Sequence, residues 1–313
     1  MTATRSVSVV VPTHDRPHLL AETMRTILRQ REVELEVVVV DDGSAVAAQA
    51  VVPALHDGRV RVVRHDAARG HAAARNTGIS AASGHWIAFC DDDDLWSPTK
   101  LTQQLAATQT NGRGWGYGGV VHVDDALTVL RGEPPPSPEQ LVADLARWDT
   151  VPAGASNVIV HRDALAEAGG FDERFRHLGD WDLWLRLARG GLPARVAAPV
   201  VAYRLHAGAM SLDAGGLVAE IALLEANGAA VDRAAFLRWV AERCLQAGRV
   251  AAGVSWLGRA AISRPPRPAE VVADVRMVAA HVRDRRPARA CQPRPPLDPW
   301  QAEAQRWLAE VPS

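Results

Sequence analysis

Three clusters of acidic and hydroxyl side chains each follow a short apolar run within the first hundred residues. The clusters are Pro12-Thr13-His14-Asp15, Asp41-Asp42-Gly43-Ser44 and Asp91-Asp92-Asp93-Asp94. Because the carboxyl ends of parallel strands lie along one edge of a sheet, we expect these clusters to share one crevice. Gathered carboxylates repel one another unless a cation or hydrogen-bond donors compensate them. A divalent ion such as Mg²⁺ or Mn²⁺ is the simplest compensation, and it would in turn hold a diphosphate.

Alternating strand and helix patterns must position these clusters. The apolar runs predict strands at 7–11, 37–40, 60–64 and 86–90, and the intervening spacing predicts helices at 19–28, 45–55 and 72–82. Strands this apolar are typical of a central, mostly parallel sheet that helices cover on both faces. The sequence therefore predicts an α/β fold of the Rossmann-like type.

The pattern loosens after the aspartate run. We expect a helix at 99–110, a strand at 117–123, a proline-rich loop at 132–138, and later strands at 156–160 and 196–203 around a helix at 179–189. From about residue 215 strand patterns vanish, and helices are expected at 217–226, 233–247, 250–262, 269–282 and 301–308. We therefore place a domain boundary near Ser211, with an α/β domain at 1–211 and a helical region at 212–313.

Composition excludes several classes of protein. The 313 residues are 48% hydrophobic and 23% charged with a net charge of −1, which excludes disorder, a disulfide scaffold and a nucleic-acid partner. Lys100 is the one lysine, so arginine supplies the other basic residues. The three cysteines are widely spaced, and no apolar run approaches the roughly 18 residues of a membrane span, so we expect a cytoplasmic protein. Nine arginines between 259 and 294 suggest a solvated helical face, or a weak attraction to a membrane surface.

Five motifs in order resemble those of the family 2 inverting glycosyltransferases. They span about residues 7–206 and comprise Val9-Val10-Val11-Pro12-Thr13-His14-Asp15-Arg16, Val39-Val40-Asp41-Asp42-Gly43-Ser44, Ala74-Arg75-Asn76-Thr77-Gly78, Phe89-Cys90-Asp91-Asp92-Asp93-Asp94-Leu95-Trp96-Ser97-Pro98 and Gly179-Asp180-Trp181-Asp182-Leu183-Trp184-Leu185-Arg186. The resemblance implies a GT-A fold, a nucleotide-sugar donor, most often a UDP-sugar, and a divalent metal.

The resemblance also implies roles for individual residues in donor binding. Seven residues from four of the motifs would line the nucleotide-sugar pocket, and Asp42 would contact the base. The seven are Pro12, Thr13, Asp15, Asp42, Arg75, Asp91 and Asp92. For Asp42 an ordinary tight turn is the structural alternative, because Asp-Gly favours turns. For Arg75 the alternative is a surface arginine.

The same resemblance implies the metal ligands and the base. The D-x-D motif maps onto Asp91, Asp92 and Asp93, with Asp93 as the leading ligand of Mn²⁺ or Mg²⁺, Asp91 beside the ribose or the metal, and His206 completing the shell. Because the run contains four aspartates, the register stays open. Asp180 would take the proton of the acceptor hydroxyl, although the family's preceding glutamate is Gly179 here. Asp182, two residues on, more naturally pairs with Arg186.

Tryptophan is unusually frequent, with ten residues against four phenylalanines and two tyrosines. Trp181 flanks the expected base and could stack on a sugar ring, and Trp96 could shape the metal loop. Core packing is the alternative, which we favour for Trp86, Trp184, Trp239 and Trp256.

Other functions fit the residues less well. A sugar-nucleotide pyrophosphorylase would need a glycine-rich basic loop after the first strand, and an aspartyl-phosphate phosphatase would need its D-x-D in that strand and a later lysine. A non-catalytic nucleotide-sugar-binding protein is supported only by Gly179. The acceptor stays open among glycans, lipid-linked glycans and small molecules.

Overall fold

The computed structural model describes residues 6–205, 214–246, 248–283 and 297–311. The chain divides into two compact units, one formed by residues 1–143, 150–207 and 297–313, and one by residues 144–149 and 208–296. His206 and Ser211, and with them the expected domain boundary, lie outside the described residues.

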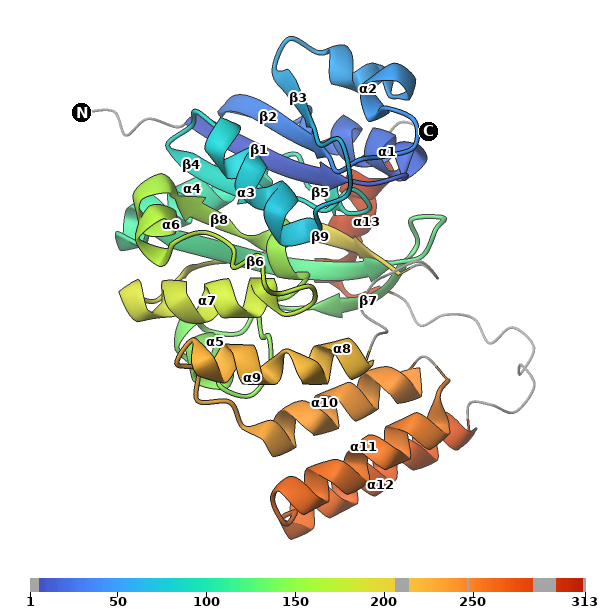
Figure 1. The fold of residues 1–313 in the computed structure, drawn as a ribbon. Coiled ribbons are helices and arrows are strands. Elements are labelled where there is room, and N and C mark those ends of the chain that lie inside the picture. Colours follow the sequence, from blue (N-terminus) through green and yellow to red (C-terminus); the bar gives the residue numbers. More distant parts are fainter. Residues whose placement is uncertain (1–5, 206–213, 247, 284–296, 312–313) are drawn as a thin grey trace. The chain divides into compact units, whose positions relative to one another are not determined.

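The first unit is built on a nine-stranded sheet (Figure 1). Its strands are β1 Ser6–Thr13, β2 Glu34–Asp41, β3 Val60–Arg64, β4 Trp86–Phe89, β5 Leu95–Trp96, β6 Trp115–Val123, β7 Val129–Glu133, β8 Ile159–His161 and β9 Ala194–Arg204. Its helices are α1 Pro17–Ile27, α2 Ala48–Val51, α3 His71–Ala81, α4 Lys100–Asn111, α5 Pro138–Asp144, α6 Arg162–Ala168, α7 Gly179–Gly190 and α13 Pro299–Leu308, with 3₁₀ turns η1 Pro53–His56 and η2 Gly154–Asn157.

The strand order is β3-β2-β1-β4-β8-β6-β9-β5, with β7 paired to β6. The first four strands of this order are parallel, as expected. Beyond β4 the sheet is mixed: β8 is antiparallel to both β4 and β6, whereas β6 and β9 are parallel. Because β1 lies between β2 and β4, the residues that follow these three strands meet at one edge.

Helix α3 packs closely on the sheet at a point where a glycine faces a bulky valine. The valines of β1 and β2 are fully buried, for example Val10 and Val38. Helix α3 contacts β1 through Gly78, where a Cβ atom would lie 2.3 Å from a methyl carbon of Val10. Only glycine permits this approach, which brings the first turn of α3 close to the edge of the sheet where the clusters meet.

Most predicted elements are confirmed to within about three residues. The expected helix at 217–226 is instead two short helices, at 214–219 and 221–226, and the first two residues of the expected loop at 132–138 belong to β7. The expected helix at 45–55 is wrong beyond one turn, because Pro53 interrupts it and starts the 3₁₀ turn η1. The expected strand at 156–160 is a 3₁₀ turn followed by the three residues of β8. The sequence patterns did not predict β5, β7, α5 or α6.

Helix α13 belongs to the sheet unit, although the sequence interpretation placed it with the helical region. Two tryptophans attach it to β9: Trp300 Nε1 donates to the Ala197 carbonyl at 2.7 Å, and Trp307 Nε1 donates to the Pro199 carbonyl at 3.3 Å. Asp298 caps the helix and completes a capping box with Gln301.

The second unit is helical. It contains α8 Ala214–Ala219, α9 Ile221–Ala226, α10 Arg233–Gln246, α11 Val250–Ser263 and α12 Pro268–Arg283. Helices α10 and α11 pack closely at Gly253, whose missing side chain leaves room for Leu245. Within the described residues, no helix combines the length and the apolar character needed to cross a membrane.

Candidate active site

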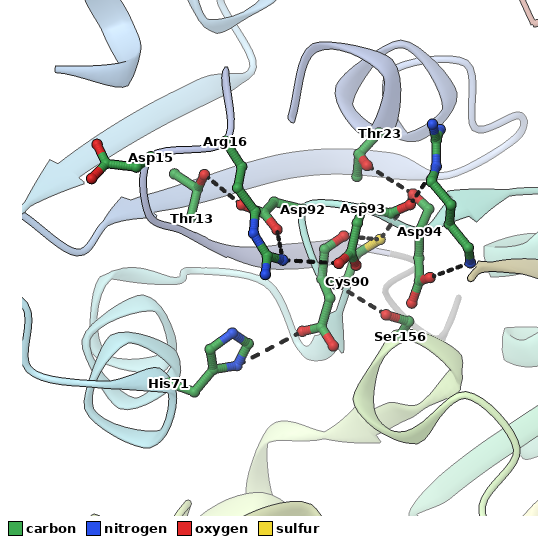
Figure 2. Close-up of polar contacts among 12 residues, drawn as sticks. Thr13, Asp15, Arg16, Thr23, His71, Cys90, Asp92, Asp93, Asp94 and Ser156 are labelled. Atoms are coloured by element: carbon green, nitrogen blue, oxygen red, sulfur yellow. Dashed lines mark hydrogen bonds and ion pairs between the residues drawn. The ribbon is translucent and has the colours of Figure 1, made fainter. Parts of the chain in front are cut away.

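The aspartate run Asp91 to Asp94 forms a loop directly after β4, and its side chains alternate in exposure. The side chains of Asp91 and Asp93 are 26% and 15% exposed, whereas those of Asp92 and Asp94 lie in the interior. The backbone N–H of Asp91 donates to Ser156 Oγ at 2.9 Å. Figure 2 shows how the loop sits among residues from several elements. Two carboxylates of the run therefore face the crevice, and two support it from behind.

The end of β1 holds the aspartate loop. Thr13 Oγ1 donates to Asp92 Oδ2 at 2.7 Å, and Arg16 Nη1 lies 3.4 Å from Asp92 Oδ1 and 2.9 Å from Asp93 Oδ2 (Figure 2). Burial, assisted by the charge of Asp93, raises the pKa of Asp92 to about 7. An arginine thus supplies part of the compensation that the acidic crevice requires, a contribution that the sequence interpretation did not assign to Arg16.

Arg75 connects the aspartate loop to the start of α7. Its guanidinium donates through Nη2 to Asp91 Oδ1 at 2.6 Å and through Nη1 to Asp180 Oδ1, and it lies over the ring of Phe171. Burial opposes the charge of Arg75, but the carboxylates of Asp180 and Asp91 raise its pKa above the usual value. For Asp91 the same pairing outweighs burial and lowers the pKa. Arg75 is therefore a buried bridge, not a surface arginine.

Asp180 lies in the first turn of α7 and is held from two sides. Besides Arg75, the backbone N–H of Ala155 donates to Asp180 Oδ2 at 3.1 Å. This amide follows Gly154, which has a φ of +48° and whose Cβ would come 3.0 Å from the same oxygen. The turn η2 therefore needs a glycine to leave room for the carboxylate.

The end of the run, Asp93 and Asp94, is held by β9. The Arg204 backbone N–H donates to Asp94 Oδ1 at 3.2 Å, and its Nε donates to the Asp93 carbonyl at 3.2 Å. Arg204 Nη2 also binds Glu22 of α1 at 2.5 Å. Burial, together with the charges of Asp93 and Asp91, raises the pKa of Asp94 well above its usual range. These contacts tie α1, β9 and the aspartate loop together.

Asp42 of the second cluster binds the backbone of the loop that precedes α3. Asp42 accepts from the backbone N–H groups of Arg69 and Gly70, both at 2.8 Å, and its Oδ1 lies 2.7 Å from His65 Nδ1. Burial opposes the charge of Asp42, but these hydrogen bonds outweigh it and lower the pKa. Asp42 thereby fixes the loop that leads into α3, and both of its oxygens are engaged.

A cavity of about 230 Å³ lies between the ends of β1 and β2. Its lining includes Thr13, Asp15, Arg16, Ser44 and Val51. Asp15 has a φ of +53°, and its Oδ1 accepts from the N–H of Ala45 at 2.7 Å, which links the two loops. Pro12 is buried within β1, where it lies opposite Val40 of β2.

The donor atoms of the crevice suit a hard divalent cation. Asp91 and Asp93 present carboxylate oxygens, which Mg²⁺ and Mn²⁺ prefer. Among the residues that the structure describes, no three His, Cys, Asp or Glu side chains form a ready cluster. His206 lies outside the described residues. Asp91 and Asp93 therefore offer carboxylate oxygens of the type that such an ion prefers.

The tryptophans predicted near the site are buried. Trp181 is 1% exposed, which leaves no ring face open to a sugar, so the sugar-platform interpretation is corrected to core packing. Trp96 is also buried; its Nε1 donates to the Ser156 carbonyl at 2.9 Å, which braces the turn beside the aspartate loop. Asp182 pairs with Arg186 at 2.5 Å, and the predicted i, i+4 contact is confirmed.

His71 is a site residue that the sequence motifs did not indicate. It begins α3, one turn before Arg75, and its Nδ1 lies 4.0 Å from Asp91 Oδ1 (Figure 2). Burial and the charge of Arg75 lower the pKa of His71. Only its position one helical turn before Arg75 could have pointed to it.

A curled mixed sheet with an aspartate loop at its edge is the architecture of GT-A type glycosyltransferases. TarS of S. aureus has a similar fold, with a TM-score of 0.58 and 16% identity over 90% of this chain and 82% of that one. A mannosyltransferase of Pyrobaculum calidifontis, solved with GDP-Man and Mn²⁺, has a TM-score of 0.57 and 19% identity over 99% and 86%.

The sequence comparisons agree with the fold. The family model described as glycosyl transferase family 2 matches residues 8–169, and the chain belongs to this family and is a glycosyltransferase. A second model, glycosyltransferase like family 2, matches residues 138–240. The Escherichia coli protein WfgD, a UDP-Glc:α-D-GlcNAc-diphosphoundecaprenol β-1,3-glucosyltransferase, is 28% identical over 58% of this chain and 70% of its own length. The uncharacterized glycosyltransferase YwdF of Bacillus subtilis is 30% identical over 63% and 73%.

Proposed function

We propose that this chain transfers a sugar from a UDP-sugar to an acceptor hydroxyl in one metal-assisted displacement that inverts the anomeric centre. The observation that carries the proposal is the Arg75 bridge, which holds Asp180 and Asp91 at the two ends of one guanidinium. Such a bridge keeps a base close to the carboxylate that faces the donor diphosphate.

The donor would lie along the edge where β1, β2 and β4 end. The cavity beside Asp15 and Ser44 is a site for the nucleobase, and Asp42 supports it through the loop at 69–70 rather than by free carboxylate oxygens. The donor in the WfgD relative is UDP-Glc, and TarS has been solved with UDP-GlcNAc, which supports a uridine nucleotide.

Asp91 and Asp93 would hold the divalent ion. When bound, this ion supplies Lewis-acid stabilisation to the departing diphosphate. The alternating exposure of the run supports this register, because Asp92 and Asp94 point into the interior. Arg16, which contacts Asp93, would contact the diphosphate as well.

Asp180 would accept the proton of the acceptor hydroxyl. As the acceptor oxygen forms its bond to the anomeric carbon, the bond from that carbon to the diphosphate oxygen breaks, and the proton passes to Asp180. Arg75 and the Ala155 N–H both bind its carboxylate, so it is fixed in orientation before the acceptor arrives.

A set of matched variants tests the proposal. The purified chain is assayed with UDP- and dTDP-sugars and Mn²⁺ for release of the nucleoside diphosphate, and UDP binding is measured by calorimetry. We expect Asp180→Asn to lower kcat by about 10² to 10⁴ with UDP affinity unchanged, and Asp93→Ala to remove the Mn²⁺-dependent part of binding. The exposed Asp163→Asn is the control.

Two results would contradict the proposal. If Asp180→Asn weakens donor binding but spares turnover of bound donor, Asp180 belongs to the nucleotide or metal site. If no donor is consumed and yet UDP-sugars bind, the chain is a binding protein on a transferase fold, as the replacement of the family's glutamate by Gly179 would allow.

The acceptor is proposed to be a lipid-linked glycan. The WfgD relative acts on a diphosphoundecaprenol-linked sugar, and its match covers 58% of this chain and 70% of its own length.

A further inference from the structure

Helices α11 and α12 carry large apolar side chains in open solvent. These helices lie side by side within the helical unit (Figure 1). Their exposed apolar residues, named here the α11–α12 surface, are between 43% and 86% exposed and comprise Val254, Ile262, Val271, Val272 and Val275. Three of the five, Val271, Val272 and Val275, lie within about 100° of one another around α12 and so share one face of that helix, and exposed apolar faces mark interaction sites.

The acidic residues of α12 are turned away from this surface. Glu270 binds Arg264 at 2.7 Å, and Asp274 lies 3.2 Å from Arg238 Nε of α10. Each acid stands one residue before an exposed valine of α12, and therefore about 100° around the helix. Hydrogen bonds from Arg264 and from the Arg267 N–H lower the pKa of Glu270 to about 2, so this carboxylate stays ionised and its charge is paired with Arg264.

The charge left in open solvent is positive. Between residues 250 and 279, the ionisable residues that are exposed are Arg259, Arg267 and Arg276. Arg259 lies over the ring of the half-buried Trp256 at 4.4 Å. Apolar side chains flanked by arginines, with the acids withdrawn, are typical of helices that lie in a membrane interface.

We propose that the α11–α12 surface docks on an anionic lipid bilayer. The positive charge flanking the valines complements anionic headgroups, and the valines enter the interface between headgroups and acyl chains. Docking on a membrane rests on the proposed function, because a lipid-linked acceptor is found only at a membrane. Docking would raise the local concentration of that acceptor without any contact to the crevice.

Vesicle co-sedimentation of the full chain tests the docking. We compare neutral phosphatidylcholine vesicles with vesicles that contain phosphatidylglycerol, at low and high salt. Each arginine near an anionic surface contributes about fivefold to partitioning, so Arg259→Gln/Arg276→Gln should lower it roughly 30-fold. Val271→Ser/Val275→Ser should lower it roughly tenfold in both salts. The matched controls, Leu130→Ser/Leu297→Ser and Arg31→Gln/Arg189→Gln, change exposed residues of the sheet unit and should bind as the wild type does.

The outcomes separate docking from catalysis. Retained vesicle binding in the two α11–α12 variants overturns the docking proposal, as does equal binding to neutral and anionic vesicles. A third result would also overturn the docking proposal. If the wild type does not bind vesicles but forms a dimer in analytical ultracentrifugation, and the valine variant abolishes this dimer, the partner of the α11–α12 surface is a second copy of this chain. UDP release from soluble donors is followed in parallel: its absence in the wild type contradicts the proposed function and leaves the vesicle result standing.

Discussion

Removal of the Arg75 guanidinium should be among the most damaging single changes near the crevice. Arg75→Met keeps the length of the side chain and its packing on Phe171 but removes both charge-assisted hydrogen bonds. Two such bonds are worth about 3–6 kcal/mol in a dry interior. Because the carboxylates of Asp91 and Asp180 are 26% and 21% exposed, water recovers part of this, and we expect a loss of about 2–4 kcal/mol in unfolding free energy.

The assay is a double-mutant cycle by thermal and urea unfolding. Arg75→Met, Asp180→Asn and the double variant are compared, and the coupling between the two positions should be about 1–2 kcal/mol. The ion pair between Arg75 and Asp91 should also make the unfolding free energy depend on pH. Its pKa is lowered in the folded state, so its share of the stability is present above the ordinary aspartate pKa of about 4 and is lost as the pH falls below that value. The wild type and Arg75→Met should therefore converge in acid.

Two results would refute this reasoning. Additive effects of Arg75→Met and Asp180→Asn would mean that the guanidinium does not hold the base. A stability difference that stays constant from neutral pH to the acid limit of folding would mean that it does not hold Asp91.

Three further variants probe the supports of the crevice. Gly154→Ala places a Cβ 3.0 Å from Asp180 Oδ2 and strains a backbone at φ +48°, so kcat should fall ten- to a hundredfold with the KM for the donor nearly unchanged; a change in KM alone would contradict the placement of Asp180. Burial lowers the pKa of Lys100 to about 7, so from pH 7 to about 10 the unfolded chain binds a proton that the folded chain does not, and stability rises with pH. Lys100→Met should abolish this rise in a series of melting temperatures, and a rise that persists would assign it to another group. Asp42→Asn replaces one acceptor oxygen by a donor and should cost about 1–3 kcal/mol, measured against Asp163→Asn; an equal effect of the two would show that Asp42 does not fix the loop at 69–70.

The elements around the crevice follow from local patterns. The valine runs of β1 and β2 and the helical spacing of α3 are readable from short windows, because a buried parallel strand needs apolar residues on both faces. The strands β5 and β7 and the helices α5 and α6 escaped because they are short and take their stability from contacts with distant parts of the chain. Helix α13 illustrates the same limit: its helical pattern is local, but Trp300 and Trp307 bind carbonyls of β9 about a hundred residues earlier.

The sequence also predicted that the crevice must be acidic, but not how the charge is compensated. Arg16 and Arg75 look like ordinary members of an arginine-rich chain. Folding brings Arg16 to Asp93 and Arg75 to both Asp91 and Asp180, across separations of up to 105 residues. The tryptophans show the reverse case: their place in the motifs favoured a sugar contact for Trp181, and tertiary packing buried it.

By itself, the sequence determined which residue types follow β1, β2 and β4, since the positions of these strands and of the turns after them can be read from local patterns. It also determined the family, because five motifs occur in order. Only the tertiary structure decided which aspartates of the run face outward, that Arg75 joins Asp91 to Asp180, and that the acids of α12 turn away from its valines. Those outcomes depend on burial and on ion pairs between distant segments, and neither is visible in any local stretch of the chain.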